Sequence, residues 1–274
     1  MPLPETFQFS QSLLQDYVDC PRRFQLRYVL MQPWPALITE SPAEFEQHLQ
    51  RGADLHRLAH QHTLGIDPER LTAAIHDATL ARWWQTFLAH PPAGLPQAIL
   101  RPEVVLTAPL AGYRLLAKFD LLAAEPGQRL VVVDWKAVQK RPSRASLARR
   151  LQTRVYRYLA VEAGAAFYGG LLPQPEQVEM VYWFAEQGGA TAWFAYDAQQ
   201  HGAARDYLAG LIEEITARQE PIWQLTPDDR RCRGCNYRSL CERGVTAAFF
   251  EELDDDVELL EPAIDLEQIA EVEF

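Results

Sequence analysis

The spacing of apolar and polar positions divides the chain into a helical first third and a mixed α/β remainder. Before Pro91-Pro92, the pattern predicts a short helix that follows a cap at Ser10 and is ended or kinked by Pro21. A second helix is predicted over residues 44–64. A third is predicted over residues 67–90, because Asp67-Pro68 places a capping side chain directly before a proline at the first helical position.

After Pro91-Pro92 the pattern changes to that of β-strands. Strands are predicted over 99–107, 113–124, 129–135, 178–185 and 190–196, and helices over 144–163 and 199–218. Pro126-Gly127-Gln128 supplies the turn between the second and third strands. This order predicts one α/β domain, followed by a cysteine-rich appendage.

Composition places the chain among ordinary globular proteins. It has 274 residues, of which 48% are hydrophobic and 23% charged, and no apolar run is long enough for a membrane span. The first residues lack the basic head and apolar stretch of a signal peptide, so we expect a cytoplasmic protein that does not associate with membranes.

The net charge of −11 is unevenly distributed. Residues 251–274 hold eleven acidic side chains and no basic one, which leaves the rest of the chain neutral. Residues 136–158 show the opposite bias, with eight basic side chains and no acid: Lys136, Lys140, Arg141, Arg144, Arg149, Arg150, Arg154 and Arg157. Such a segment is either a footprint for nucleic-acid phosphates or a solvated basic helix face.

Two carboxylates and a lysine form the strongest chemical signal. The valines at 131–133 indicate a strand buried on both faces, on which the charged Asp134 needs a cationic partner. Lys136, two residues on, projects from the same face. Asp120 and Asp134 are symmetric about Gly127, so a hairpin centred there makes them cross-strand neighbours with Cβ atoms roughly 5 Å apart.

Carboxylates that close repel each other unless a proton or a metal ion lies between them. An oxygen-rich site suits Mg²⁺ or Mn²⁺, and Lys136 would place or activate a water and offset phosphate charge. The alternative is a plain ion pair between Asp134 and Lys136, with Asp120 in a turn. The hairpin symmetry and the basic segment downstream favour the metal site.

Further residues fit around this pair. Gln152 and Tyr156, four residues apart, lie on one helical face, and Arg149 shares that side. His56 and His60 have the same spacing, but the glutamate of an H-E-x-x-H zinc site is missing.

Together these residues resemble the PD-(D/E)xK nuclease superfamily in its RecB-like branch. The resemblance rests on Gly52-x-x-x-His56, Asp120, Asp134-x-Lys136 and Gln152-x-x-x-Tyr156, in the family's order and approximate spacing. It implies a restriction-endonuclease-like mixed β-sheet flanked by helices, with His56, Asp120 and Asp134 as ligands of Mg²⁺ or Mn²⁺ and Lys136 as the catalytic lysine. Gln152 and Tyr156 would contact DNA or support the site, as would Lys140, Arg141, Arg149 and Arg150. Glu103 is a further candidate acid.

The four cysteines form a second candidate site. Cys232, Cys235 and Cys241 are clustered, and only Cys20 is left to complete a fourth ligand position. Spacing alone leaves zinc, an iron–sulfur cluster and free thiols open. The flanking residues, Tyr17-x-x-Cys20-Pro21 among them, resemble AddB-type nucleases and CRISPR-associated adaptation nucleases, which implies a 4Fe–4S cluster that pins the two ends of the chain together.

We therefore predict a metal-dependent deoxyribonuclease that hydrolyses phosphodiester bonds, acts exonucleolytically and serves DNA repair, recombination or defence. Its predicted regions are a helical part (1–95), a nuclease core (96–220), an iron–sulfur cap (221–250) and an acidic tail (251–274). No P-loop motif is present, so a helicase would be a separate partner. The alternatives are a CRISPR adaptation nuclease that trims spacer precursors with integrase subunits, a non-catalytic DNA-binding subunit of a helicase–nuclease complex, and an RNA nuclease.

Overall fold

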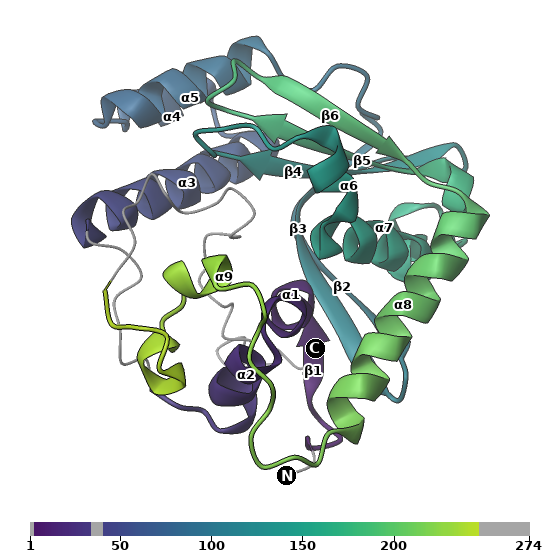
Figure 1. The fold of residues 1–274 in the computed structure, drawn as a ribbon. Coiled ribbons are helices and arrows are strands. Elements are labelled where there is room, and N and C mark those ends of the chain that lie inside the picture. The colour runs from purple at the N-terminus through teal and green to yellow at the C-terminus, as the bar shows by residue number, and fades with distance from the viewer. Residues whose placement is uncertain (1–2, 34–40, 247–274) are drawn as a thin grey trace.

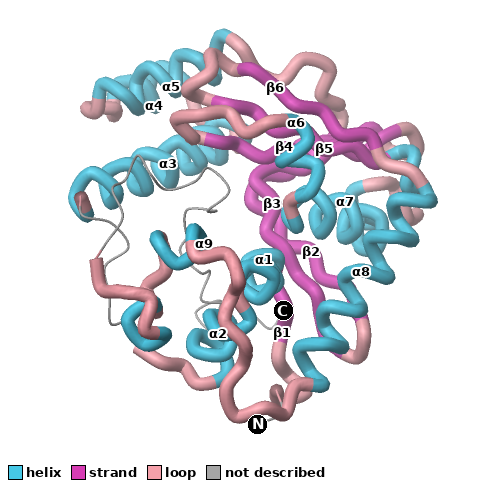
Figure 2. The backbone as a smooth tube through the Cα atoms, viewed as in Figure 1, coloured by secondary structure: helices cyan, strands magenta, loops and turns pink. Residues whose placement is uncertain are grey.

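The computed structural model describes residues 3–33 and 41–246, so the acidic tail predicted at 251–274 lies outside the described residues. The chain folds around one six-stranded sheet of mixed direction (Figures 1 and 2). Its strands are β1 (Gln8–Ser10), β2 (Ile99–Leu110), β3 (Tyr113–Glu125), β4 (Arg129–Lys136), β5 (Val178–Phe184) and β6 (Ala190–Ala195). The sheet with its flanking helices confirms the predicted fold class.

Strand β3 organises the sheet because three other strands pair with it. β2 runs antiparallel along nearly its whole length. The opposite edge of β3 is shared: β1 pairs in parallel with residues 114–116, and β4 pairs antiparallel with residues 121–125. Between these two pairings, residues 117–120 of β3 have no strand paired on that edge within the described part of the chain. Asp120 lies at the end of this gap.

Helices cover both faces of the sheet. The N-terminal group is α1 (Gln11–Asp19), α2 (Pro21–Phe24) and a π-helix (Gln25–Val29); next come α3 (Pro42–Thr63), α4 (Pro68–Ala73), α5 (Ala78–Ala89), α6 (Arg144–Arg149), α7 (Leu151–Ala163), α8 (Ala198–Ala217) and α9 (Arg230–Arg233). Three 3-10 turns complete the list, at Gly164–Phe167, Pro175–Gln177 and Arg238–Cys241.

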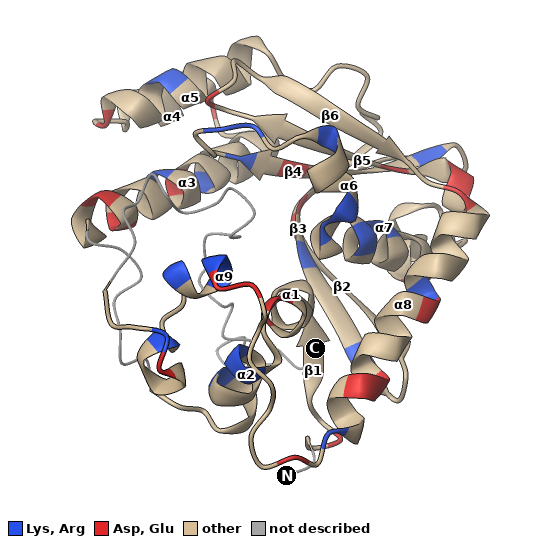
Figure 3. Ribbon diagram, in the orientation of Figure 1, with Lys and Arg blue, Asp and Glu red and all other residues tan. Residues whose placement is uncertain are grey.

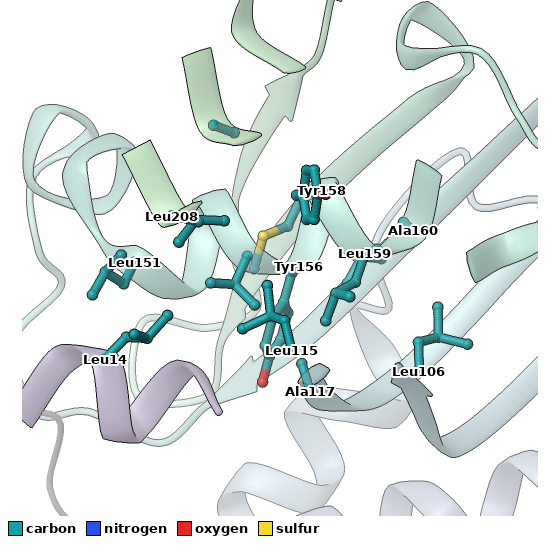
Figure 4. Packing of buried hydrophobic residues seen from close by; sticks show 14 of the residues in the cluster. Leu14, Leu106, Leu115, Ala117, Leu151, Tyr156, Tyr158, Leu159, Ala160 and Leu208 are labelled. Carbon is teal, nitrogen blue, oxygen red and sulfur yellow. The ribbon is translucent and has the colours of Figure 1, made fainter. Parts of the chain in front are cut away.

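The larger core lies between the sheet and helices α1, α7 and α8. Leu115 and Ala117 of β3 pack with Tyr156 and Leu159 of α7 (Figure 4). Val132 of β4 belongs to the same core. Burial of this many fully enclosed apolar side chains is the main force that holds α7 against the sheet.

The smaller core lies on the opposite face, under α3 and α5. Val131 and Val133 face this side and pack with the tryptophans of α5, Trp83 and Trp84, both fully buried. The valines at 131–133 therefore point alternately into the two cores, and the predicted two-sided burial of β4 is confirmed.

The inward-facing pattern of β3 slips by one residue at Asp120. Ala117 and Phe119 face the larger core, and so do Leu122 and Ala124, so the alternation changes parity between them. The neighbouring β2 does the same near Glu103, which has a positive φ of 56°. The two irregular positions lie side by side, because Val104 pairs with Phe119 and Pro102 pairs with Leu121.

Several predicted elements are confirmed in detail. The Ser10 side chain caps α1 by accepting a hydrogen bond from the Leu13 N–H at 3.2 Å, and Asp67 caps α4 in the same way. The predicted hairpin turn is present, with Gly127 at a φ of 76°. A residue with a Cβ adopts this left-handed conformation only at a cost, so glycine suits the position.

Two element predictions were wrong, and one strand was missed. The helix predicted over 67–90 is two helices, because the Asp77 side chain accepts from the Leu80 N–H and starts a new one. The helix predicted over 144–163 is broken at Arg150, whose backbone is extended. Strand β1 was not predicted, because it is short and takes its pairing from β3, a hundred residues away in the sequence.

The two ends of the described chain pack together. The ring of Trp223 stacks on Phe24 with centroids 5.8 Å apart, and its edge meets Tyr17. The side chain of Gln25 accepts from the Trp223 N–H at 2.9 Å and donates to the Pro221 carbonyl at 3.1 Å. These contacts join the N-terminal helices to the cysteine-rich segment.

The boundaries of the four predicted regions stay predictions. Within the described residues, no helix combines the length and apolar character needed to cross a bilayer.

Replacing Trp223 by alanine should lower the free energy of unfolding by about 3–5 kcal/mol, because a large buried aromatic side chain is lost. Urea unfolding followed by tryptophan fluorescence and circular dichroism measures this. The control is Ile222→Ala, since the neighbouring Ile222 is 70% exposed against 5% for Trp223. Equal stability of the two variants would contradict the role of Trp223.

Candidate active site

Asp134 lies near the end of the buried part of β4, and its carboxylate is 1% exposed. The Gln152 side-chain amide donates to Asp134 Oδ1 at 2.7 Å. Lys136 Nζ is 3.0 Å from Asp134 Oδ2. An ionised carboxylate buried this deeply is tolerable only when cations and donors face it, and both are supplied here. Two strand positions and one helix position thus build this half of the site.

Behind Gln152 lies a buried chain of hydroxyl groups. The Tyr182 hydroxyl donates to Gln152 Oε1 at 3.3 Å and shares a 2.7 Å hydrogen bond with the Thr153 hydroxyl. Burial, together with the charge of Asp134, raises the pKa of Tyr182 well above its usual value, so the phenol stays neutral. Lys136 Nζ lies 5.9 Å from the centre of the Tyr182 ring. Tyr182 therefore supports both the amide and the lysine that hold Asp134.

Asp120 forms the other half of the site with His56 from α3. Asp120 Oδ1 lies 3.1 Å from His56 Nδ1, and the Trp135 N–H donates to Asp120 Oδ2 at 2.8 Å. Burial alone would raise the pKa of Asp120, but the His56 charge and hydrogen bond and the Trp135 amide outweigh it and hold the pKa below its ordinary value. Asp120 is therefore an ionised carboxylate at neutral pH.

The second nitrogen of His56 also faces an oxygen. His56 Nε2 lies 3.0 Å from the Trp135 carbonyl. Both ring nitrogens thus face hydrogen-bond acceptors. A histidine can donate to both acceptors only when both of its ring nitrogens carry a proton. A metal cation bound among these atoms would interact favourably with the same oxygens while the imidazole stays neutral. The chemistry of this donor set, one imidazole with carboxylate and carbonyl oxygens, fits a divalent metal ion.

Glu103 joins His56 and Asp120. These three residues each offer a ligand atom, and the three atoms lie within 4.8 Å of one another. Glu103 also forms an ion pair with Lys118 on the neighbouring strand. The candidate acid from the sequence thus lies beside His56 and Asp120, in a group that could hold a metal ion.

The strand register predicted for Asp120 and Asp134 is present in part. β3 and β4 pair with the expected symmetry through Leu121 and Val133, the residues next to Asp120 and Asp134. Beyond that pair the carboxylates take different partners, since Asp120 turns to His56 of α3 and Asp134 to Gln152 of α7. A metal ion shared by His56, Asp120 and Asp134 stays a prediction.

The basic segment after β4 has mixed roles. Lys140 and Arg149 are exposed and Arg150 is half-buried, and Lys and Arg positions lie along α6 and the start of α7 (Figure 3). Others serve the fold: Arg157 is buried and donates to the Ala195 carbonyl at 2.7 Å, and Arg141 donates to the Thr191 carbonyl at 2.7 Å. Contact of Lys140, Arg141, Arg149 and Arg150 with DNA stays a prediction.

The four cysteines come from the two ends of the described chain and meet in one region. Burial and, to a smaller extent, the nearby Cys235, Cys20 and Cys241 together raise the pKa of Cys232 to about 11. Arg23 opposes this shift at Cys232 and at Cys235, while Arg22 bonds to Cys241. The four thiols therefore lie close enough to interact electrostatically, and two guanidinium groups lie beside them.

Comparison with protein families shows which family the chain belongs to. The family model described as the PD-(D/E)XK nuclease superfamily matches residues 8–242, which include every residue discussed above. The chain belongs to the PD-(D/E)XK nuclease superfamily.

Two solved structures that are similar to this PD-(D/E)XK chain have low sequence identity to it. A candidate exonuclease from Eubacterium rectale is 12% identical with a TM-score of 0.43, covering 75% of this chain and 79% of its own. A protein named SSO0001 is 11% identical with a TM-score of 0.40, covering 87% of each chain. No curated protein is detectably similar in sequence.

Sequence reasoning missed Tyr182, Thr153 and the Trp135 carbonyl. Tyr182 is paired directly with Asp134 across the parallel β4–β5 ladder. The register of that ladder depends on a crossover through α6 and α7, which no local pattern encodes. A tyrosine inside the apolar run of β5, where it needs a polar partner, was the available signal.

Tyr182→Phe should lower the free energy of unfolding by about 1–3 kcal/mol, because the Thr153 and Gln152 side chains lose a buried partner. Tyr168→Phe is the matched control: its hydroxyl is buried and has no hydrogen-bond partner among the described residues, so we expect little change. Chemical denaturation of both variants gives the comparison. A Tyr182→Phe variant as stable as Tyr168→Phe would show that the hydroxyl chain contributes nothing.

Proposed function

We propose that this PD-(D/E)XK protein is a divalent-metal-dependent deoxyribonuclease of the RecB-like branch that degrades DNA from its ends. The observation that carries the proposal is the meeting of two sets of groups at the open edge of β3. One set, His56 and Asp120 with the Trp135 carbonyl, has the donor chemistry of a metal site. The other set is Asp134 with Lys136.

His56, Asp120 and Asp134 would hold Mg²⁺ or Mn²⁺. Such an ion polarises a phosphoryl oxygen and lowers the pKa of a bound water. The protein's own share of the work is positioning. Gln152 fixes one oxygen of Asp134, so that the other faces Lys136, and the Trp135 amide fixes one oxygen of Asp120. Carboxylates held in this way need no reorganisation when substrate arrives.

Lys136 is suited to act on the phosphate. Its side chain is 12% exposed, so its charge is little screened by water, and Asp134 is its ion-pair partner. From this position its ammonium group would offset the negative charge that develops on the phosphate and orient the attacking water. The buried ring of Tyr182 limits where the lysine side chain can move.

The exposed cations beyond β4 would hold the DNA backbone. Lys140 and Arg149 extend from the segment that leads directly away from Lys136, and Arg150 follows. Phosphate contacts of this kind carry no sequence information, so we expect cleavage without strong sequence preference and binding that weakens as salt rises.

We also propose that the four cysteines bind a 4Fe–4S cluster. Cys20 and the three cysteines of the C-terminal segment lie close enough for their charges to interact. Their spacing and the residues around them resemble nucleases that carry such a cluster. Arg22 and Arg23 would offset the negative charge of the thiolates.

This chemistry would serve DNA repair or recombination beside a separate helicase that unwinds the duplex. The same chemistry would trim spacer precursors in defence, beside CRISPR integrase subunits. The complete Asp120, Asp134 and Lys136 set argues against a purely DNA-binding subunit.

Asp134→Asn and Lys136→Gln should each reduce Mg²⁺- or Mn²⁺-dependent cleavage by about a thousandfold, because charge stabilisation at the phosphate is lost. End-labelled linear and closed circular DNA, single- and double-stranded, serve as substrates; cleavage of linear DNA alone supports exonucleolytic action. Asp206→Asn is the control, since that side chain is 74% exposed on α8. Full activity in the Asp134→Asn variant would remove this site.

Protein purified without oxygen should be brown, absorb broadly around 400 nm and contain iron rather than zinc. Because the chain has only four cysteines, Cys20→Ser alone should remove the iron and lower the melting temperature. Ser239→Ala, within the same turn as Cys241, should keep the iron. Elemental analysis that finds zinc and no iron would refute the cluster.

A further inference from the structure

Glu103 occupies an unusual place in β2. Its backbone has a φ of 56°, in a strand where neighbouring residues are extended, and the face alternation of β2 changes there. A glutamate gains nothing locally from this conformation, since the left-handed region is disfavoured for residues with a Cβ. What the conformation achieves is placement: a Glu103 oxygen lies within 4.8 Å of the ligand atoms of His56 and Asp120.

Lys118 is the cation next to this group. It belongs to β3, two residues before Asp120, and its ammonium group pairs with the Glu103 carboxylate. The lysine side chain is 40% exposed and that of Glu103 is 20% exposed. Lys118 is the more exposed partner and can therefore move into solvent at a smaller cost in burial, while Glu103 stays beside His56.

We infer that Glu103 is an additional carboxylate ligand of the divalent metal ion, and that Lys118 is its exchangeable counter-ion, which sets the affinity for the metal. Without metal, the lysine neutralises Glu103, so two carboxylates can lie close together. When the metal binds, its charge takes over this role and the ammonium group leaves. This inference rests on the proposed metal dependence of the site.

The competing explanation is an ordinary surface ion pair. Such pairs form across this sheet elsewhere: Arg129 lies 3.3 Å from Glu179 on the neighbouring strand, with similar exposure and without a histidine among its partners. If Glu103 and Lys118 were only a pair of this kind, their charges would have no consequence for metal binding. The two pairs thus provide a matched comparison within one protein.

The two charges have opposite expected effects on the metal. Loss of the Glu103 charge removes a ligand, so affinity should fall by about tenfold or more, as it does when groups that hold a metal site are removed. Loss of the Lys118 charge removes a competitor, so affinity should rise. An exposed ion pair is weak, so the rise should be about two- to fivefold and should shrink at high salt.

The test is calorimetric titration of Mn²⁺ into the metal-depleted full-length protein without DNA, at low and high salt. The variants are Glu103→Gln and Lys118→Met, with Glu179→Gln and Arg129→Met as controls. We expect weaker binding for Glu103→Gln, tighter binding for Lys118→Met, and unchanged binding for both controls. Thermal unfolding without metal checks that each variant is folded.

The outcomes distinguish a failure of the proposed metal site from a failure of the roles inferred for Glu103 and Lys118. If wild type binds no Mn²⁺, or His56→Ala binds as well as wild type, the proposed metal site itself fails. If His56→Ala loses binding while Glu103→Gln and Lys118→Met match their controls, only the present inference is overturned. Should Glu103→Gln not fold, Lys118→Met decides, since it keeps the carboxylate: unchanged or weaker binding by that variant overturns the inference.

Discussion

The site depends on one energetically costly feature, the carboxylate of Asp134, which is buried near the end of β4. Asp134 follows a run of valines that the two cores enclose on both sides. Water reaches almost none of it, so its charge is stable only while Lys136 and Gln152 face it. Helix α7 must therefore pack closely on the sheet, and Tyr182 and Thr153 must satisfy the far side of Gln152. A large part of the core serves to keep this one charge in place.

The second constraint is the divided edge of β3. A continuous ladder along that edge would use the backbone of residues 117–120 in pairing. β1 and β4 instead take opposite ends of the edge and leave the middle open. The irregular backbones of β2 and β3 at the same level turn Glu103 and Asp120 toward α3 and His56. The sheet thus places His56, Glu103 and Asp120 on one side and Lys136 with Asp134 on the other, and the backbone of Trp135 contacts His56 and Asp120.

Local signals in the sequence predicted most of the frame. Ser10 and Asp67 caps, the turn at Gly127 and the buried valines are short-range features, and each was found where expected. The symmetry about Gly127 also predicted the β3–β4 register. Pairings between distant segments were not predictable, as β1 on β3 and Tyr182 beside Asp134 show. The slip at Glu103 escaped prediction too, because the alternation of apolar residues is interrupted by only one position there.

The packing of Trp223 on Phe24 has a consequence for how the protein is made. Synthesis proceeds at about 5–20 residues per second, so roughly 10–40 seconds pass between the appearance of Phe24 and that of Trp223. During that time the apolar side of α1 and α2 and the thiol of Cys20 lack the segment that covers them. The growing chain therefore exposes these apolar side chains and an oxidisable thiol until the segment around Trp223 has been made.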